Sequence, residues 1–266
     1  MARVIDPDDE TTWPDELVSF INTNISSIID YEEHQARLNS LSTLQYLRLG
    51  QPKNPFREDR DRVIASIDAD LREFHIIGYH ATRVTESEAA DLAGGLLEVL
   101  SMDLVKRRVD RACGEGLFSS EQGAELIRSS QAADLAERHG KRLGIVWMIF
   151  FKSLARDNGL YRLFRFWGGE ATYWAHEETA LGDALQRAGR PALLKCEAKI
   201  SDLNPHESVA SRLVAAFAER RGTRCVNGYE FESYSRAPVR VSKVIRWGTE
   251  EFDDLTGHQD WCLTLD

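Results

Sequence analysis

The segment His75-Ile-Ile-Gly-Tyr-His-Ala-Thr-Arg-Val84 decides the fold class, together with Thr85-Glu-Ser-Glu88, which follows it directly. The ten residues up to Val84 have the β-branched and aromatic composition of a strand. Thr85 and Glu88 have the spacing of a capping box, in which each side chain accepts a hydrogen bond from the other residue's backbone N–H. A strand that runs into a capped helix indicates sheet and helix in one domain, and we predict an α+β fold.

The chain before this segment has a different character. Residues 11–73 carry apolar residues at helical spacing, and we predict a helical N-terminal region over 1–73, followed by a second domain over 74–266. Residues 1–100 contain 19 Asp and Glu against 9 Lys and Arg, whereas residues 101–266 contain 24 of each. The net charge of −10 therefore comes from the first part, and it argues against non-specific nucleic-acid binding by the whole chain.

The second domain carries predicted helices and strands in alternation. We predict a helical insert over about 101–160, because Ser119 and Gln122 have the spacing of a second capping box and the apolar residues over 143–154 are typical of a buried helix. Further along the chain we predict strands at 171–175, 192–200, 229–234 and 239–247, and helices at 176–188 and 204–221.

The cysteines and the apolar runs exclude several classes of protein. The four cysteines form no Cys-x-x-Cys pair, so we expect reduced thiols and neither a disulfide framework nor a zinc site. The longest apolar run, 145–151, is shorter than the roughly 20 residues that cross a bilayer. The acidic N-terminus has no apolar segment of the kind found in secretory signals. We therefore expect a cytoplasmic protein without a membrane partner.

Three short segments place polar groups in strand-like surroundings. Each has an ordinary structural explanation when taken alone, since a lone His before a helix is usually a structural hydrogen-bonding group. Two glutamates separated by one residue in a strand share a face and are usually solvated. The three segments, in chain order, are Tyr79-His80-Ala81-Thr82, Gly168-Gly169-Glu170-Ala171-Thr172-Tyr173-Trp174-Ala175 and Tyr229-Glu230-Phe231-Glu232-Ser233-Tyr234.

Taken in this order, the segments resemble the motifs of the mono-ADP-ribosyltransferase and PARP superfamily of the His-Tyr-Glu type. His80-Ala-Thr82, followed by a capped helix and Gly95-Leu96, is similar to the first motif. Gly168-Gly169 and Tyr173-Trp174-Ala175 are similar to the second, and Glu230-Phe-Glu232 to the third. The resemblance covers about residues 74–247, and the insert at 101–160 departs from a minimal member of the family.

The resemblance implies a split antiparallel β core and the transfer of ADP-ribose from NAD to a macromolecular acceptor, either protein or nucleic acid, without a metal. It implies that His80 and Thr82 hydrogen-bond NAD, and that Tyr173 and Trp174 form the nicotinamide site. A glutamate would stabilise the positive charge that develops on the ribose. That glutamate is Glu230 in the register of PARP-like members, and Glu232 in the Glu-x-Glu register of arginine-modifying relatives.

Two other functions stay open at this point. An NAD glycohydrolase would use the same site with water as the acceptor, and a non-catalytic domain on this fold would bind a protein or a nucleotide. No Gly-x-Gly-x-x-Gly, Walker or Gly-x-Ser-x-Gly motif supports a different enzyme class. The resemblance is compatible with a bacterial toxin, a defence enzyme or a modifying enzyme, and within it we expect the insert at 101–160 to select the acceptor.

Overall fold

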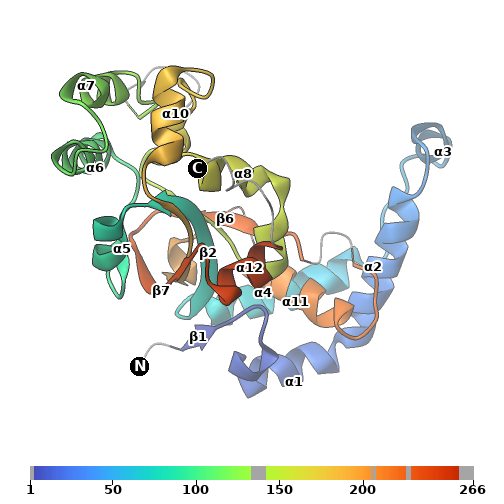
Figure 1. Ribbon diagram of the computed structural model, residues 1–266. Coiled ribbons are helices and arrows are strands. Elements are labelled where there is room, and N and C mark those ends of the chain that lie inside the picture. Colours follow the sequence, from blue (N-terminus) through green and yellow to red (C-terminus); the bar gives the residue numbers. More distant parts are fainter. Residues whose placement is uncertain (1–2, 133–141, 205, 207, 226–228, 258–266) are drawn as a thin grey trace. The chain divides into compact units, whose positions relative to one another are not determined.

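A computed structural model describes residues 3–132, 142–204, 206, 208–225 and 229–257. Helices and one curled, largely antiparallel sheet occur together, which confirms the α+β class (Figure 1). The chain forms two compact units: the first contains Met1–Ile76, Lys199–Ser201 and Pro205–Phe231, and the second contains Ile77–Ala198, Asp202–Asn204 and Glu232–Asp266. Each unit is described by itself below.

The first unit is helical. Its core is formed by apolar side chains such as Ile21, Ile28, Ile67 and Phe217, which are almost completely buried. The prediction of helices over 11–73 is confirmed. Its elements are β1 (Val4–Ile5), α1 (Asp15–Thr23), α2 (Ile25–Asn39), α3 (Thr43–Arg48), α4 (Arg57–Leu71) and α11 (Val209–Glu219).

The first unit extends beyond the predicted N-terminal region of 1–73. Helix α11 packs on α2 and α4, so that residues 205–231 group with the N-terminal helices although the sequence had placed them in the second domain. Eight of the residues from Val209 to Ala218 are buried, so α11 has little solvent-facing surface and needs the other helices to cover it.

The second unit contains the sheet, in the strand order β3-β7-β5-β2-β4-β6. The pairs β2–β4, β4–β6, β5–β7 and β3–β7 are antiparallel. The first residues of β2 belong to the first unit, where they pair in parallel with β1. The strands are β2 (His75–Val84), β3 (Leu96–Leu97), β4 (Val146–Ile149), β5 (Arg190–Lys199), β6 (Glu232–Ser235) and β7 (Val239–Arg246).

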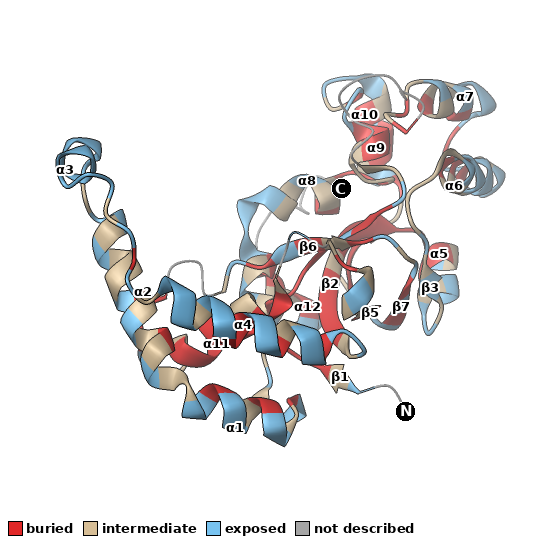
Figure 2. Ribbon diagram, turned by 180° about the vertical axis from the view of Figure 1, so that it is seen from behind, coloured by how far each residue is buried: buried red, intermediate tan, exposed pale blue. Residues whose placement is uncertain are grey.

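Helices accompany the sheet of the second unit. Both predicted capping boxes are present, at Thr85 with Glu88 and at Ser119 with Gln122. A core of buried side chains, among them Leu126, Trp167 and Tyr173, joins several of these helices. Figure 2 shows buried residues on α9 and α10 in red. The helices are α5 (Glu86–Leu92), α6 (Met102–Gly114), α7 (Ser120–Arg128), α8 (Tyr161–Arg165), α9 (Glu170–Tyr173), α10 (Ala180–Arg187) and α12 (Glu250–Thr256).

Two predicted elements have the wrong type. The predicted helix over 143–154 is instead the strand β4, followed by a 3-10 turn at Lys152–Arg156, so the insert over 101–160 is only partly helical. A short apolar run is compatible with a buried strand as well as a buried helix. Here β2 and β6 pair with β4 on its two edges. The predicted strand over 171–175 is instead the end of helix α9, which begins after Gly169.

Other boundaries shift by a few residues. Helix α10 begins at Ala180 and not at 176, and α11 begins at Val209, after its cap Ser208, and not at 204. Strand β6 begins at Glu232, so Glu230 lies before it. Part of the predicted insert, 133–141, lies outside the described residues. No helix in the described part of the chain is long and apolar enough to cross a membrane.

Candidate functional site

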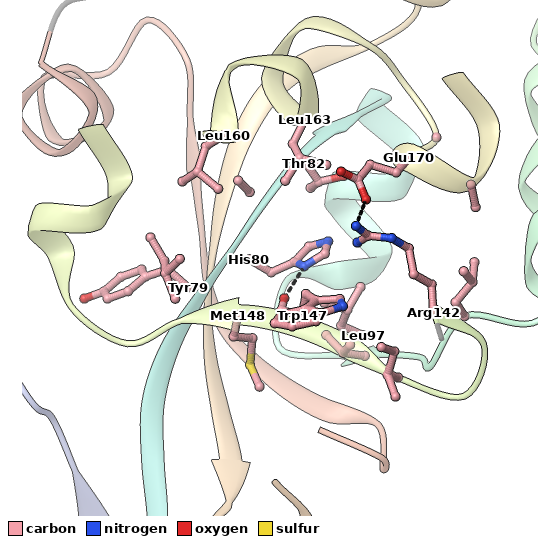
Figure 3. Close-up of a pocket in the computed structure, with 18 of the residues that line it drawn as sticks. Tyr79, His80, Thr82, Leu97, Arg142, Trp147, Met148, Leu160, Leu163 and Glu170 are labelled. Carbon is pink, nitrogen blue, oxygen red and sulfur yellow. Dashed lines mark hydrogen bonds and ion pairs between the residues drawn. The ribbon is translucent and has the colours of Figure 1, made fainter. Parts of the chain in front are cut away.

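A pocket lies in the second unit where strands β2 and β4 part (Figure 3). Its volume is about 300 Å³, at the lower end of the range for small-molecule sites. In the described residues the register between β2 and β4 is the single pair Tyr79–Ile149. Beyond that pair a side chain replaces the backbone ladder, since Nδ1 of His80 lies 2.7 Å from the carbonyl oxygen of Trp147. The two strands therefore open around the pocket.

His80 enters the pocket from β2. Tyr79 and His80 leave the strand on opposite sides, and Tyr79 is 1% exposed (Figure 3). A carbonyl oxygen only accepts hydrogen bonds, so Nδ1 of His80 carries the hydrogen in the bond to Trp147. Nε2 of the neutral ring is then an acceptor, available to a ligand hydroxyl or amide.

The surroundings of His80 keep its ring neutral. Burial lowers the pKa of His80 below its ordinary value, and the positive charge of Arg108 acts in the same direction. The hydrogen bond to the Trp147 carbonyl opposes these effects without overcoming them. Thr82, two residues further along β2, is 6% exposed and lines the same pocket. Strand alternation places the two side chains on one face.

Arg108 of α6 is fixed in the wall of the pocket by Glu88. Its Nε donates to Oε1 of Glu88 at 2.6 Å, while Nε1 of Trp167 donates to Oε2 at 2.9 Å. Burial alone would raise the pKa of Glu88, but the charge and hydrogen bond of Arg108, with the bonds from Thr85 and Trp167, lower it below its ordinary value. The capping residue Glu88 thus remains an anion and holds Arg108 against the ring of Trp167.

A second ion pair, between Arg142 and Glu170, also lines the pocket (Figure 3). Glu170 opens helix α9 directly after Gly168 and Gly169, which have φ angles of 90° and 70°. A Cβ on Gly168 would lie 2.7 Å from Cβ of Thr172, so both the φ angle and the close approach require glycine there. The turn at Gly168 and Gly169 directs Glu170 into the pocket.

The charges that line the pocket are mostly negative, and both of its arginines face carboxylates. The sheet and the neighbouring segments add an apolar lining. The charged lining residues are Glu98, Arg108, Arg142, Asp157, Glu170 and Glu232. The apolar lining includes Leu97, Leu104, Trp147, Met148, Leu160 and Leu163.

The two candidate glutamates have different positions. Glu232 is the first residue of β6, pairs across the sheet with Ile149 and lines the pocket. Glu230 is exposed, belongs to the first unit and does not line this pocket. The structure therefore brings together His80, Thr82 and Glu232, and it leaves Glu230 outside.

The aromatic residues of the second predicted motif do not reach the pocket either. Tyr173 is completely buried, and its ring stacks on Phe166 with a centroid distance of 5.1 Å. Burial raises the pKa of Tyr173 well above its ordinary value, as do the charges of nearby glutamates. Trp174 is 49% exposed, with the guanidinium of Arg162 over its ring. In the strand predicted over 171–175, Tyr173 and Trp174 would point to opposite faces. In the structure, α9 turns Tyr173 into the core and leaves Trp174 partly exposed outside the pocket.

Sequence reasoning missed the other side chains of this site. Trp147 was hidden in an apolar run that predicted a helix, although it is 40% exposed in the pocket. Glu170 had a detectable signal, because a carboxylate that directly follows two glycines stands at a turn. Arg108 and Arg142 had none, since their positions depend on contacts with Glu88 and Glu170.

Within the described residues, no group of three or more His, Cys, Asp or Glu side chains is arranged to hold a metal ion. Comparison with known proteins assigns the chain to no family, because no protein-family model, no curated protein and no solved structure matches it.

Proposed function

We propose that the protein is an NAD-dependent mono-ADP-ribosyltransferase that acts on a macromolecular acceptor, with a sheet of the split antiparallel type. The observation that carries the proposal is the pocket at the parting of β2 and β4, where His80, Thr82 and Glu232 come together from distant parts of the sequence. These are residues that the family resemblance links to NAD, and they share one cavity.

The proposed reaction breaks the bond between nicotinamide and C1′ of the ribose, and nicotinamide leaves with the bonding electron pair. A nucleophilic atom of the acceptor then bonds to C1′ and gives up its proton to a base. The ribose carries positive charge in the transition state, and the carboxylate of Glu232 stabilises that charge. Nε2 of His80 accepts a hydrogen bond from a ribose hydroxyl or from the carboxamide, and Thr82 adds a second polar contact to NAD.

Trp147 takes the role that the resemblance gave to Tyr173. Its indole lines the pocket and packs edge-on against Tyr234 at a centroid distance of 5.4 Å, which holds the ring in place. A fixed aromatic face in the cavity provides a stacking surface for nicotinamide. Tyr173 instead stabilises the core behind the pocket.

Arg142 is the group that meets the diphosphate of NAD. Arg108 is held by the buried Glu88, whereas Arg142 is 41% exposed at its side chain and is paired with Glu170. Phosphate oxygens bind arginine in the same forked geometry as a carboxylate does. NAD binding therefore exchanges Glu170 for the diphosphate at Arg142.

The decisive experiment incubates the full chain with NAD labelled in the adenylate part, with protein, DNA or RNA as acceptor, and follows both nicotinamide release and label transfer. Transfer to one acceptor class is the expected result. Nicotinamide release without transfer would identify a glycohydrolase, and binding of intact NAD would identify a non-catalytic domain. Neither binding nor cleavage of NAD would contradict the proposal.

A further inference from the structure

The first unit contains an apolar surface that its own fold does not use. We name residues 40–57, which include helix α3 and the turn that follows it, the α3 tip. Helix α3 has six residues and none of them is buried, and Figure 2 shows it exposed along its whole length beyond the end of α2. The tip contains four of the large exposed apolar side chains of the described residues: Leu44 (67% exposed), Leu49 (61%), Leu47 (54%) and Tyr46 (37%).

Local hydrogen bonds stabilise α3 in place of a core. Ser42 and Gln45 form a complete capping box, with the Ser42 N–H donating to Oε1 of Gln45 at 2.9 Å. The turn after the helix places Gly50 and Gln51 in the left-handed region, and Gln51 is the one non-glycine residue with positive φ in the described chain. So short a helix is marginal by itself, and here it presents leucines to solvent and buries none of its residues.

The charge of the α3 tip is opposite to that of the chain. Residues 40–57 contain no Asp or Glu and three Arg or Lys, in a protein with a net charge of −10. Within the described residues, Arg48 and Lys53 make no ion pair, and Arg57 meets only the exposed Asp61 at 3.7 Å. Arg48 lies between Leu47 and Leu49 in the sequence, and it and Lys53 are available to a partner's carboxylates.

A hollow between α2 and the tip provides polar groups next to these leucines. Its lining includes Tyr31, Gln35, Asn39, Tyr46 and Lys53. Its wall is held by Asn54, which is 7% exposed and donates from Nδ2 to the carbonyl oxygen of Tyr31 at 2.8 Å. Amide and phenol groups match the backbone N–H and C=O groups of a peptide.

We propose that the α3 tip is a docking surface for a segment of another protein that carries Asp or Glu beside Leu, Phe or Trp. The leucines accept the apolar side chains, Arg48, Lys53 and Arg57 accept the carboxylates, and the hollow accepts the backbone. Contact between the α3 tips of two copies would bring like charges together, which disfavours self-association through this surface. A lipid surface would cover the leucines but would leave the polar hollow unused.

The test selects ligands for the full chain from a displayed library of random twelve-residue peptides. The expected peptides are enriched in Asp or Glu next to Leu, Phe or Trp. A synthetic copy of the best one should bind less tightly at high salt, because exposed charges are screened. The double variant Leu44→Glu, Leu47→Glu and the single variant Lys53→Glu should each weaken its binding at least tenfold.

Leu117→Glu is the matched control, because Leu117 is also an exposed apolar residue, at 37%, but lies in the second unit. It should leave peptide binding unchanged, and circular dichroism should show all variants folded. Peptides without acidic enrichment, or peptide binding that survives all α3-tip variants, would overturn the proposal. So would a dimer, or binding to phosphatidylglycerol vesicles, that the double variant abolishes, since these would identify a second copy or a membrane as the occupant.

Discussion

The pocket has two walls that are built in different ways. On the β2 side, the alternation of a strand points His80 and Thr82 into the cavity from one face, while Tyr79 on the other face is buried and also contributes to the lining. On the α9 side, a turn of two glycines and a short helix point Glu170 into the cavity and Tyr173 into the core. In the first wall, side chains change sides at every residue, as in any strand. In the second wall, their directions rotate with the turn of a helix. In both walls polar side chains reach the cavity while the tyrosine is buried, although one wall is a strand and the other is a helix.

The largest expected effect concerns Tyr173. Replacing it with alanine removes a fully buried ring from the core, and we expect a loss of about 3–5 kcal/mol in the free energy of unfolding, measured by denaturant titration. Tyr173→Phe is the control. Within the described residues the buried hydroxyl has no hydrogen-bond partner, so its removal should cost little or be favourable. A stable Tyr173→Ala protein that loses only NAD binding would instead place the ring in the site.

The next effect separates the two glutamates. Glu232→Gln keeps the size of the side chain but removes the charge that stabilises the ribose cation, so turnover should fall about 100- to 1000-fold with little change in NAD affinity. Glu230→Gln is the matched control and should retain normal turnover, because Glu230 is outside the pocket. Nicotinamide release measures both variants. The reverse pattern would support the PARP-like register and would place the reaction elsewhere.

The β2 wall could be predicted from the sequence because its signals are local. Strand composition and the capping box at Thr85 and Glu88 fix where the strand ends and the helix begins. The alternation then assigns His80 and Thr82 to one face without knowledge of the rest of the fold. Even so, the sequence could not show that Glu88 also anchors Arg108, since that contact joins two helices.

The α9 wall could not be predicted in the same way. The segment 171–175 is largely apolar and aromatic, which fits a strand. In the structure Tyr173 lies in α9 and packs on Phe166, a contact that the local sequence does not reveal. Strand β4 shows the same limit, because its apolar residues are compatible with both structures until its neighbours are known. The opening between β2 and β4, which creates the pocket, depends on pairing across the sheet and has no local signal.

A smaller effect is expected at the Arg142–Glu170 pair. Glu170→Gln releases Arg142 from its carboxylate, so NAD should bind more tightly, by a factor of about five, as expected for a partly exposed ion pair worth less than about 1 kcal/mol. Equilibrium binding at low and at high salt measures the change, which should shrink as salt screens the charges. Nicotinamide riboside, which lacks the diphosphate, is the control ligand and should bind both proteins equally. Equal tightening for both ligands would show that Glu170 acts on another part of NAD.

The smallest effect at neutral pH concerns His80. Its folded-state pKa lies below the ordinary value of 6.5, because burial and the charge of Arg108 disfavour the imidazolium. The native protein therefore binds fewer protons than the unfolded chain as the pH falls below about 6.5, so His80 lowers stability in acid and not at neutral pH. Protonation also removes the acceptor at Nε2, so NAD affinity should stay constant from pH 8 to about 6.5 and fall only at lower pH, as the pH passes through the depressed pKa of His80.

The fall in NAD affinity at low pH, which we call the acid limb, can be assigned to His80 more clearly than the fall in stability can. Burial lowers the pKa of His176 as well, so both histidines contribute to the loss of stability in acid. His176 bonds Oγ of Ser129 and does not line the pocket, so its titration should leave NAD affinity unchanged. His80→Gln should bind NAD more weakly at pH 7.5 but without the acid limb, whereas His176→Gln should keep the limb. An acid limb that persists in His80→Gln would show that NAD does not use Nε2 of His80, and the β2 wall would then hold the ligand through Thr82 alone.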